Sequence, residues 1–366
     1  MKKIVILIYN LLGGGNELQA YLLADLLESK GKDVKLISVK SANYMPETPL
    51  NRTGVISLNS KSKVSAALAL KRLLSQITPD VLIAFNSPTS TIAELASLSG
   101  RSYKLIVSEK KDVHINETFK SRLRIMMHNL ADLVVVNSFE QLNKLEKINT
   151  KVAAKTKVIY NGVDLNRFKP RIYADKAESN VCKILVVAQF AYHKNPFKLL
   201  EALRNLAQTD LNIEVHWYGT NFFLNGEPTE ASACYLVLHE KIEQEGLEDL
   251  FYLKPPVGNI EELYSAFDVL CHPSLTEGFS NAIIEGMACG LPVIASKSGD
   301  NEKVIEQGVN GFLFNPDSAP GIQAAILDFL KLNKREVEEM GVLNRAKGEA
   351  LFSSEKMLDA YLQILS

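Results

Sequence analysis

Two glutamates, Glu277 and Glu285, lie eight positions apart beside a short G-F-S loop at residues 278–280. The loop precedes a predicted helix, and a helix N-terminus presents free N–H groups and the positive end of the helix dipole, so it favours an anion such as phosphate. A carboxylate repels phosphate but accepts hydrogen bonds from sugar hydroxyls. Together these groups would bind a nucleotide sugar. In isolation, the same spacing also fits a solvated loop residue and a surface helix residue.

The elements around this loop predict a strand, a loop, a helix and a second strand. Apolar runs at 266–273 and 291–296 are typical of buried parallel strands. The helix between them, residues 280–289, has Ser280 in the N-cap position and Gly290 as its C-terminal stop. Strands and helices alternate in the same way along most of the chain, which predicts an α/β fold with doubly wound parallel sheets.

This whole unit closely resembles the donor-site signature of retaining glycosyltransferases of family 4, which have the GT-B fold. The resemblance implies that Glu277 contacts the donor sugar and that Glu285 binds the ribose hydroxyls of the nucleotide. It also implies that backbone groups hold the diphosphate, at Gly278, Phe279 and Ser280. The expected architecture is therefore two Rossmann-like domains that face a central cleft.

A second motif predicts where the domains meet. The run N-G-V-D-L-N-R-F-K-P ends at Pro170 and resembles the family's passage between domains, and the polar stretch after it has the composition of a linker. We expect an acceptor-binding domain at 1–170 and a nucleotide-sugar-binding domain at 171–349. We also expect a C-terminal helix, within 350–366, that packs back on the first domain.

The composition is that of a globular protein with two domains. The chain has 366 residues, of which 46% are hydrophobic and 23% charged, enough for two separate cores. No apolar run approaches the ~20 residues that span a bilayer. The basic start and short apolar run at 2–8 are interpreted as a first strand rather than a signal peptide, because a glycine-rich loop and a charged helix follow. Four scattered cysteines without a C-x-x-C pair predict reduced thiols in a cytosolic protein, and they give a metal site little support.

The charge is divided unequally along the chain. Residues 1–170 carry 25 lysines and arginines and 14 acidic residues, a balance of +11, whereas residues 171–366 have a balance of −12. The first half is therefore expected to face an anionic partner. Nucleic acid fits the charge but no recognition motif supports it, so an anionic membrane surface or a phosphorylated acceptor is the better interpretation.

The chain opens with a strand, a glycine-rich loop, a helix and a second strand in residues 2–39. A dinucleotide-binding module would show G-x-G-x-x-G and an acidic residue after the second strand. Here the loop reads G-G-G-N-E-L and Lys40 follows the strand. Gly14, Gly15 and Glu17 resemble the family's G-G-x-E segment, which approaches the donor phosphate and the acceptor. A tight turn without a ligand is the alternative.

The segment S-E-K-K-D at 108–112 stands where many family members have a histidine near the reacting centre. It resembles a subgroup that acts on lipid-linked oligosaccharides and usually has S-E-R-N. This departure leaves the role of Glu109 open. The carboxylate either orients the acceptor or forms an ion pair with Lys110 or Lys111.

A predicted helix at 117–130 mixes basic and large apolar residues. Its basic residues are Lys120, Arg122 and Arg124. Such a mixture favours docking to an anionic membrane or binding of a lipid diphosphate, and the alternative is an ordinary amphipathic helix whose apolar face packs on the sheet. Two nearby histidines, His114 and His128, are expected to be polar surface residues.

The second domain begins with a segment that resembles the family's G-R-x(4)-K-G motif. Lys194 matches the lysine that neutralises the departing diphosphate. Gln189 stands at the usual arginine position and Ala188 replaces the glycine, so the charge stabilisation is expected to depend on Lys194 and the helix N-terminus. Further along, Pro256 lies in a P-P-V segment that resembles the loop contacting the base.

The sequence contains no D-x-D pair of the kind that holds a divalent metal in other glycosyltransferases, so we expect neither a metal nor another cofactor. The resemblance implies a UDP-sugar donor, with N-acetylgalactosamine or N-acetylglucosamine, and retention of anomeric configuration. It also implies a polyprenyl-diphosphate-linked saccharide acceptor in O-antigen or capsule assembly, and a cytoplasmic protein bound peripherally to the inner membrane. Two alternatives stay open, a nucleotide-sugar 2-epimerase of GT-B type and a sugar-nucleotide-binding protein without catalysis.

Overall fold

The computed structural model describes residues 2–10, 14–40, 54–110, 119–170, 181–209, 211–220, 223–224 and 227–366. The chain forms two compact units, which are described separately. Unit 1 comprises Met1–Gly162 and Ser353–Ser366, and unit 2 comprises Val163–Phe352. The chain thus crosses between the units eight residues before Pro170, and it returns after Phe352 rather than 349.

Local contacts explain why residues 163–170 belong to unit 2. The Val163 N–H donates to the Phe352 carbonyl at 2.8 Å, and the Phe168 ring packs edge-on against Tyr264 with centroids 5.9 Å apart. The Arg167 guanidinium pairs with the Glu261 carboxylate at 2.8 Å. The N-G-V-D motif is therefore divided between the two units.

Unit 1 is built on a seven-stranded parallel sheet with strand order β3-β2-β1-β4-β5-β6-β7. Its strands are β1 (Lys3–Ile8), β2 (Asp33–Ser38), β3 (Ile56–Ser57), β4 (Val81–Phe85), β5 (Lys104–Glu109), β6 (Leu133–Val136) and β7 (Thr156–Val158). Strands such as β4, V-L-I-A-F, are buried along their whole length because helices cover both faces of the sheet.

The helices of unit 1 divide between these faces. One hydrophobic cluster joins the sheet to α1 (Gly15–Ser29) and α14 (Ser354–Leu365). The other joins it to α2 (Lys63–Ile77), α3 (Ser87–Ser97), α4 (Phe119–Met127), α5 (Phe139–Ile148) and α6 (Thr150–Ala154). A short 3-10 helix, η1 (His128–Leu130), follows α4. The C-terminal helix α14 thus completes the core of the unit that begins the chain.

Unit 2 has a six-stranded parallel sheet of order β12-β9-β8-β13-β14-β15. Its strands are β8 (Cys182–Val187), β9 (Ile213–Tyr218), β12 (Phe251–Lys254), β13 (Val269–His272), β14 (Val293–Ser296) and β15 (Gly311–Phe314). A separate antiparallel pair, β10 (Phe223–Leu224) and β11 (Glu227–Pro228), precedes α8. The two parallel sheets confirm the predicted doubly wound α/β class.

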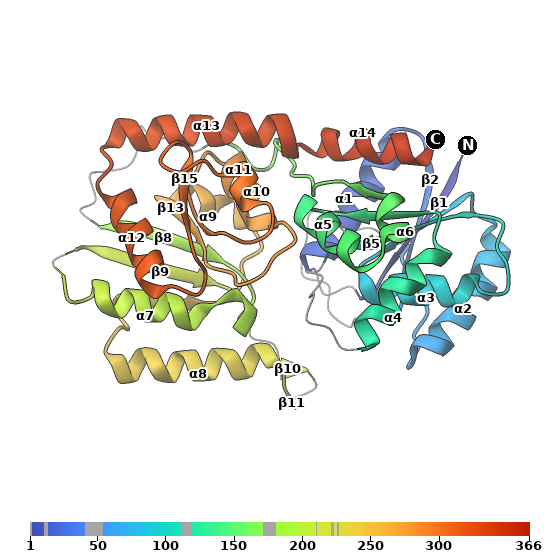
Figure 1. Cartoon of the computed structure of the whole chain (residues 1–366), viewed down its shortest axis with the longest axis horizontal. Helices are drawn as coiled ribbons and strands as arrows, with labels where there is room; N and C mark the ends of the chain where they lie inside the picture. The colour runs from blue at the N-terminus through green and yellow to red at the C-terminus, as the bar shows by residue number, and fades with distance from the viewer. Residues whose placement is uncertain are drawn as a thin grey trace. The chain divides into compact units, whose positions relative to one another are not determined.

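The helices of unit 2 also form layers on its sheet (Figure 1). One core cluster contains residues from α7 (Pro196–Leu206), α8 (Glu230–Glu245) and α12 (Ala319–Leu330). The remaining helices are α9 (Ile260–Ala266), α10 (Asn281–Ala288), α11 (Asn301–Val304), α13 (Lys334–Phe352) and the 3-10 helix η3 (Tyr192–Lys194). Among the helices that the structure describes, none has the length and apolar character needed to cross a bilayer.

Each sheet has one point where the strand order reverses. In unit 1 the chain moves outward from β1 to β2 and β3, then restarts at β4 on the other side of β1. In unit 2 the reversal lies between β8 and β13. Because ligands of open α/β sheets bind beyond the carboxyl ends of strands at such points, the loops after β1, β4, β8 and β13 are the candidate binding loops.

Candidate active site

The loops after β8 and β13 contact each other at the reversal point of unit 2. The Leu275 N–H donates to the His193 carbonyl at 2.8 Å, and the Asn195 side-chain amide donates to the Pro273 carbonyl at 3.1 Å. Asn195 adopts the left-handed conformation, with φ of 66°, which turns the chain from η3 into α7. These contacts hold the loop that contains Lys194 against the loop that contains Glu277.

Lys194 and Glu277 form an ion pair, with side chains 18% and 15% exposed. The Glu277 Oε1 atom also accepts a hydrogen bond from the Ser274 hydroxyl at 3.1 Å and lies 3.1 Å from His272 Nε2. Burial by itself raises the pKa of Glu277, but the Lys194 ammonium and the His272 ring outweigh it and hold the pKa well below its usual value. Glu277 is therefore a carboxylate at neutral pH.

Sequence reasoning missed His272 and Ser274. Both are buried polar residues at the carboxyl end of β13. Their position in the C-H-P-S segment could have identified them. An apolar strand ends there in polar side chains, at the edge of the sheet that binds ligands.

The loop at 278–280 leads into the N-terminus of α10. Ser280 occupies the N-cap position, as the pattern predicts, but its side chain makes no capping hydrogen bond. Phe279 is buried against Phe352, with ring centroids 5.0 Å apart. The Phe279 side chain is thus taken up by the core, and the first-turn N–H groups of α10 lie at the end of the loop.

Gly299 supports the same loop from behind. It has a φ of +60°, and a Cβ atom there would lie 2.3 Å from the Gly278 carbonyl oxygen. Any side chain at this position would push the loop away from its place. The backbone at Gly278 is therefore held by a close contact that only glycine allows.

Glu285 lies within α10, where the Tyr264 hydroxyl donates to its Oε2 atom at 2.8 Å. Burial raises the pKa of Glu285 to about 7. The two glutamates of the motif consequently differ in charge at neutral pH, since Glu277 is ionised and Glu285 is near its midpoint. The second Glu285 oxygen can accept a hydrogen bond from a ligand hydroxyl.

Gln189 and Pro256 are exposed and follow β8 and β12, at the carboxyl edge of the sheet. The described contacts join neither of them to Lys194 or Glu277. The backbone beside Gln189 is fixed, because the Trp217 indole N–H donates to the Ala188 carbonyl at 2.8 Å.

In unit 1, Gly14 and Gly15 are exposed at the start of α1, after β1. A Cβ atom on Gly14 would lie 2.7 Å from the Glu17 carboxylate, which folds back toward the helix N-terminus. The two glycines thus lie at the reversal point of their own sheet, where the backbone is accessible to a ligand.

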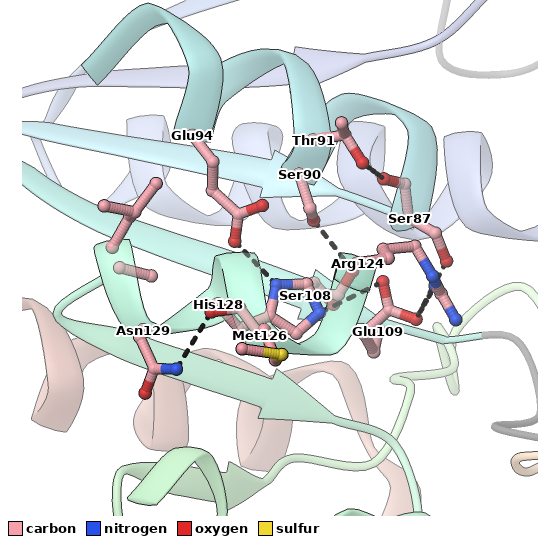
Figure 2. A network of polar contacts seen from close by, with 12 residues as sticks. Ser87, Ser90, Thr91, Glu94, Ser108, Glu109, Arg124, Met126, His128 and Asn129 are labelled. Carbon is pink, nitrogen blue, oxygen red and sulfur yellow. Dashed lines mark hydrogen bonds and ion pairs between the residues drawn. The ribbon is translucent and has the colours of Figure 1, made fainter. Parts of the chain in front are cut away.

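Glu109 is completely buried and takes part in a network of polar side chains (Figure 2). It pairs with Arg124, rather than with Lys110 as one of the two predictions proposed; Lys111 lies outside the described residues. The Ser87 hydroxyl also donates to Glu109, at 2.8 Å. Burial raises the pKa of Glu109, but His128 and Arg124 outweigh it and lower the pKa below its usual value.

The prediction that His128 is a surface residue is wrong, whereas His114 lies outside the described residues. The helix η1 turns the His128 ring inward, so that Nδ1 lies 2.6 Å from the Glu94 carboxylate and Nε2 lies 3.6 Å from Glu109 (Figure 2). Burial lowers the pKa of His128, but the two glutamates raise it to about 9. An imidazolium between two carboxylates therefore joins α3, β5 and η1.

The basic residues of α4 have different environments. Arg124 is turned inward to Glu109, whereas Arg122 is exposed beside the exposed apolar residues Leu123 and Met126. The side chain of Lys120 lies outside the described residues. Of the basic residues predicted to face a membrane, Arg124 is thus internal. Arg122 forms an exposed basic and apolar face with Leu123 and Met126.

Comparisons with known proteins cover both units. The family model "Glycosyltransferase Family 4" matches residues 13–167, and the model "Glycosyl transferases group 1" matches residues 169–341. The chain is 22% identical to the spore coat protein SA of Bacillus subtilis, over 96% of this chain and 94% of that protein. It is 26% identical to the amylovoran biosynthesis glycosyltransferase AmsD of Erwinia amylovora, over 84% and 85%.

Solved structures share the fold. The Anabaena protein HepE, in complex with UDP and glucose, superposes with a TM-score of 0.82 at 20% identity, over 100% of this chain and 99% of that one. TarM superposes with a TM-score of 0.79 at 14% identity, over 99% and 98%. The paired parallel sheets, the reversal-point site and the two family matches lead to one conclusion: this chain is a glycosyltransferase of family 4, with the GT-B fold.

Proposed function

We propose that this protein is a retaining glycosyltransferase that moves N-acetylgalactosamine or N-acetylglucosamine from a UDP-sugar to a saccharide carried on a polyprenyl diphosphate. The observation that carries the proposal is the cluster in unit 2, in which an ammonium, an ionised carboxylate and a helix N-terminus meet at one edge of the sheet. The complex of HepE with UDP and glucose supports the donor class, and AmsD supports a role in polysaccharide assembly.

In this proposal each group binds a different part of the donor. The first-turn N–H groups of α10 and the Lys194 ammonium bind the diphosphate, and Glu277 accepts a hydrogen bond from a hydroxyl of the sugar. Glu285 accepts hydrogen bonds from the ribose. Because an ammonium has three N–H donors, Lys194 can contact the phosphate while it stays paired with Glu277. In unit 2, Gln189 and Pro256 border the site.

Transfer breaks the bond between the anomeric carbon and the diphosphate oxygen, and it forms a bond from the same carbon to the acceptor oxygen on the same face of the sugar. Negative charge develops on the departing diphosphate, where Lys194 and α10 stabilise it. The departing phosphate oxygen accepts the proton of the acceptor hydroxyl, so no side chain is needed as a base. No metal ion takes part in this scheme.

The acceptor side of the proposal rests on unit 1. The helix α4 exposes Leu123 and Met126, 49% and 59% accessible, beside Arg122. An apolar and basic face of this kind binds at the surface of an anionic membrane. We therefore assign the acceptor to unit 1 and place the protein on the cytoplasmic face of the inner membrane, with a lipid-linked acceptor.

The test measures release of nucleoside diphosphate from UDP-, GDP- and ADP-sugars in EDTA, with and without a polyprenyl-diphosphate-saccharide. We expect acceptor-dependent release from a UDP-sugar and an α-linked product from an α-linked donor. Lys194→Ala should lower kcat by about 10²-fold or more. Lys198→Ala, which removes a partly exposed lysine from α7, serves as the matched control.

Other outcomes would contradict the proposal in distinct ways. Inversion of the anomeric centre would refute retention, and loss of all activity in EDTA with recovery in Mg²⁺ would refute the metal-free scheme. Conversion of the UDP-sugar to its C2 epimer without any acceptor would favour the epimerase. Tight UDP binding with no turnover of any donor or acceptor would favour a protein that only binds nucleotide sugars.

A further inference from the structure

Lys110 follows β5 directly and is buried, with 6% of its surface exposed. Its ammonium donates to the Asn161 side-chain oxygen at 2.8 Å and lies over the Phe85 ring, 4.5 Å from the ring centre. Both partners are neutral. In the described part of the chain, no carboxylate pairs with this buried amine.

Two partly buried arginines of the protein have carboxylate partners. Arg124 pairs with Glu109 and Arg167 pairs with Glu261. Lys110 lacks such a partner, and burial alone lowers its pKa to about 7. About half of the molecules therefore carry a neutral amine at pH 7. An anion that reached this amine would restore the charge that burial disfavours.

The place of Lys110 is one where a ligand is expected. Phe85 ends β4, the strand beside β1 at the reversal point of unit 1, and Lys110 continues the adjacent strand. Phe85 belongs to the core cluster shared with α1 and α14, whereas Glu109 contacts α3 and α4 on the other face of the sheet. Lys110 is thus separate from the network in Figure 2.

The partners of Lys110 are themselves fixed. Gly162, next to Asn161, is held by two hydrogen bonds with the Gln19 side chain of α1, at 2.8 and 2.9 Å. A Cβ atom on Gly162 would lie 3.1 Å from Ser354 and Met357 at the start of α14. The amine is therefore presented at the carboxyl edge of the sheet by rigid elements.

We propose that Lys110, oriented by Asn161 and Phe85, binds a phosphate oxygen of a substrate in unit 1. The identity of that substrate rests on the proposed function, whereas phosphate binding by Lys110 does not. In that reaction the phosphate belongs either to the donor diphosphate or to the lipid diphosphate of the acceptor. Binding converts the neutral amine to an ammonium, so phosphate binding takes up a proton near pH 7. Arginine at this position would bind the same oxygen without proton uptake.

The experiment uses isothermal titration calorimetry of the full chain with inorganic pyrophosphate at pH 7.0, in two buffers of different ionisation enthalpy. All proteins carry Lys194→Ala, which removes the phosphate-binding lysine of unit 2. In this background we expect uptake of about half a proton from the Lys110 amine. Addition of Lys110→Met should weaken binding about tenfold or more and abolish this uptake. Lys157→Met, which removes an exposed lysine from β7, is the matched control.

Lys110→Arg keeps the proposal testable if the methionine variant does not fold. It should keep the affinity within a few-fold but lose the proton uptake. Pyrophosphate binding and proton uptake that are unchanged in both Lys110 variants would overturn the proposal. Titration with UDP and with a short-chain polyprenyl diphosphate then identifies the source, because only the true ligand should depend on Lys110. Pyrophosphate binding requires no glycosyl transfer, so failure of the proposed function would leave this result unaffected.

Discussion

The Lys194 ammonium and the Glu277 carboxylate form an ion pair although 83 positions separate them in the sequence. The pair exists because β8 and β13 are neighbours in the sheet, with the loops after them held together by backbone contacts. It keeps Glu277 ionised in spite of its burial. The group that would accept a sugar hydroxyl and the group that would bind phosphate are thus oriented before the donor arrives, which reduces the cost of binding.

Glu285 should make nucleoside binding depend on pH. Burial raises its pKa to about 7, so it is a neutral acid below that pH and, above it, a carboxylate that accepts hydrogen bonds from ribose hydroxyls more strongly. We expect the Kd for uridine, which has no phosphate, to decrease as pH rises from 6 to 8, with a midpoint near 7. Nuclear magnetic resonance titration measures this Kd.

Two variants test the assignment to Glu285. Glu285→Gln should bind uridine weakly at every pH. Tyr264→Phe removes a hydrogen bond that lowers the pKa of Glu285, so the midpoint should move to higher pH. A midpoint that stays in place or moves to lower pH would contradict this explanation.

Gly299→Ala should weaken UDP binding, because Gly299 supports the loop at residues 278–280. A Cβ atom at this position would overlap the Gly278 carbonyl oxygen, so the loop must shift and the Kd for UDP should increase about tenfold or more. Gly308→Ala is the matched control, because its φ of +74° is similar but nothing lies within 4 Å of the added Cβ. It should cost about 1 kcal/mol of stability and leave the Kd unchanged. Equal effects of the two variants on UDP binding would refute the role given to Gly299.

His128→Gln should destabilise the protein by about 3–5 kcal/mol at pH 7, because it leaves Glu94 buried without its cation and Glu109 with Arg124 alone. The folded-state pKa of His128 is raised to about 9, so its stabilisation is complete below pH 6.5 and is lost as pH rises through 9. The cost of the substitution should therefore be smaller at pH 10. Urea denaturation at the two pH values measures it.

A histidine on the surface gives the control for that experiment. His239→Gln alters an exposed residue of α8 and should change the free energy of unfolding by less than about 0.5 kcal/mol at either pH. If His128→Gln is equally mild, the buried network does not hold α3, β5 and η1 together.

The exposed apolar residues of α4 should be needed for membrane binding. Leu123→Ser with Met126→Ser should reduce flotation with vesicles rich in phosphatidylglycerol several-fold, because the apolar face no longer enters the interface. Arg122→Ala should weaken the part of binding that depends on salt. The control is Leu236→Ser with Val237→Ser, which alters exposed apolar residues on α8 of unit 2. Equal loss of flotation in both double variants would argue against α4 as the docking element.

The sequence by itself determined the class of fold and the family. Parallel strands that are buried on both faces are continuous apolar runs, as in β4 and β13, and such runs are visible without knowledge of their neighbours. The segment that contains Glu277 and Glu285 is also continuous, so its loop and helix could be predicted from local residues. Ser280 is an example, since its N-cap position was predicted correctly from the local sequence.

The tertiary structure alone decided which side chains meet. The strand order brought His272, Ser274 and Lys194 to Glu277, and the direction of η1 turned His128 from an expected surface residue into a buried imidazolium. It also gave Glu109 an arginine partner and, among the residues that the structure describes, paired Lys110 with Asn161 rather than with a carboxylate. Such pairings depend on sheet order and on which face of a strand each side chain occupies, and residues far apart in the sequence carry no local pattern that records them.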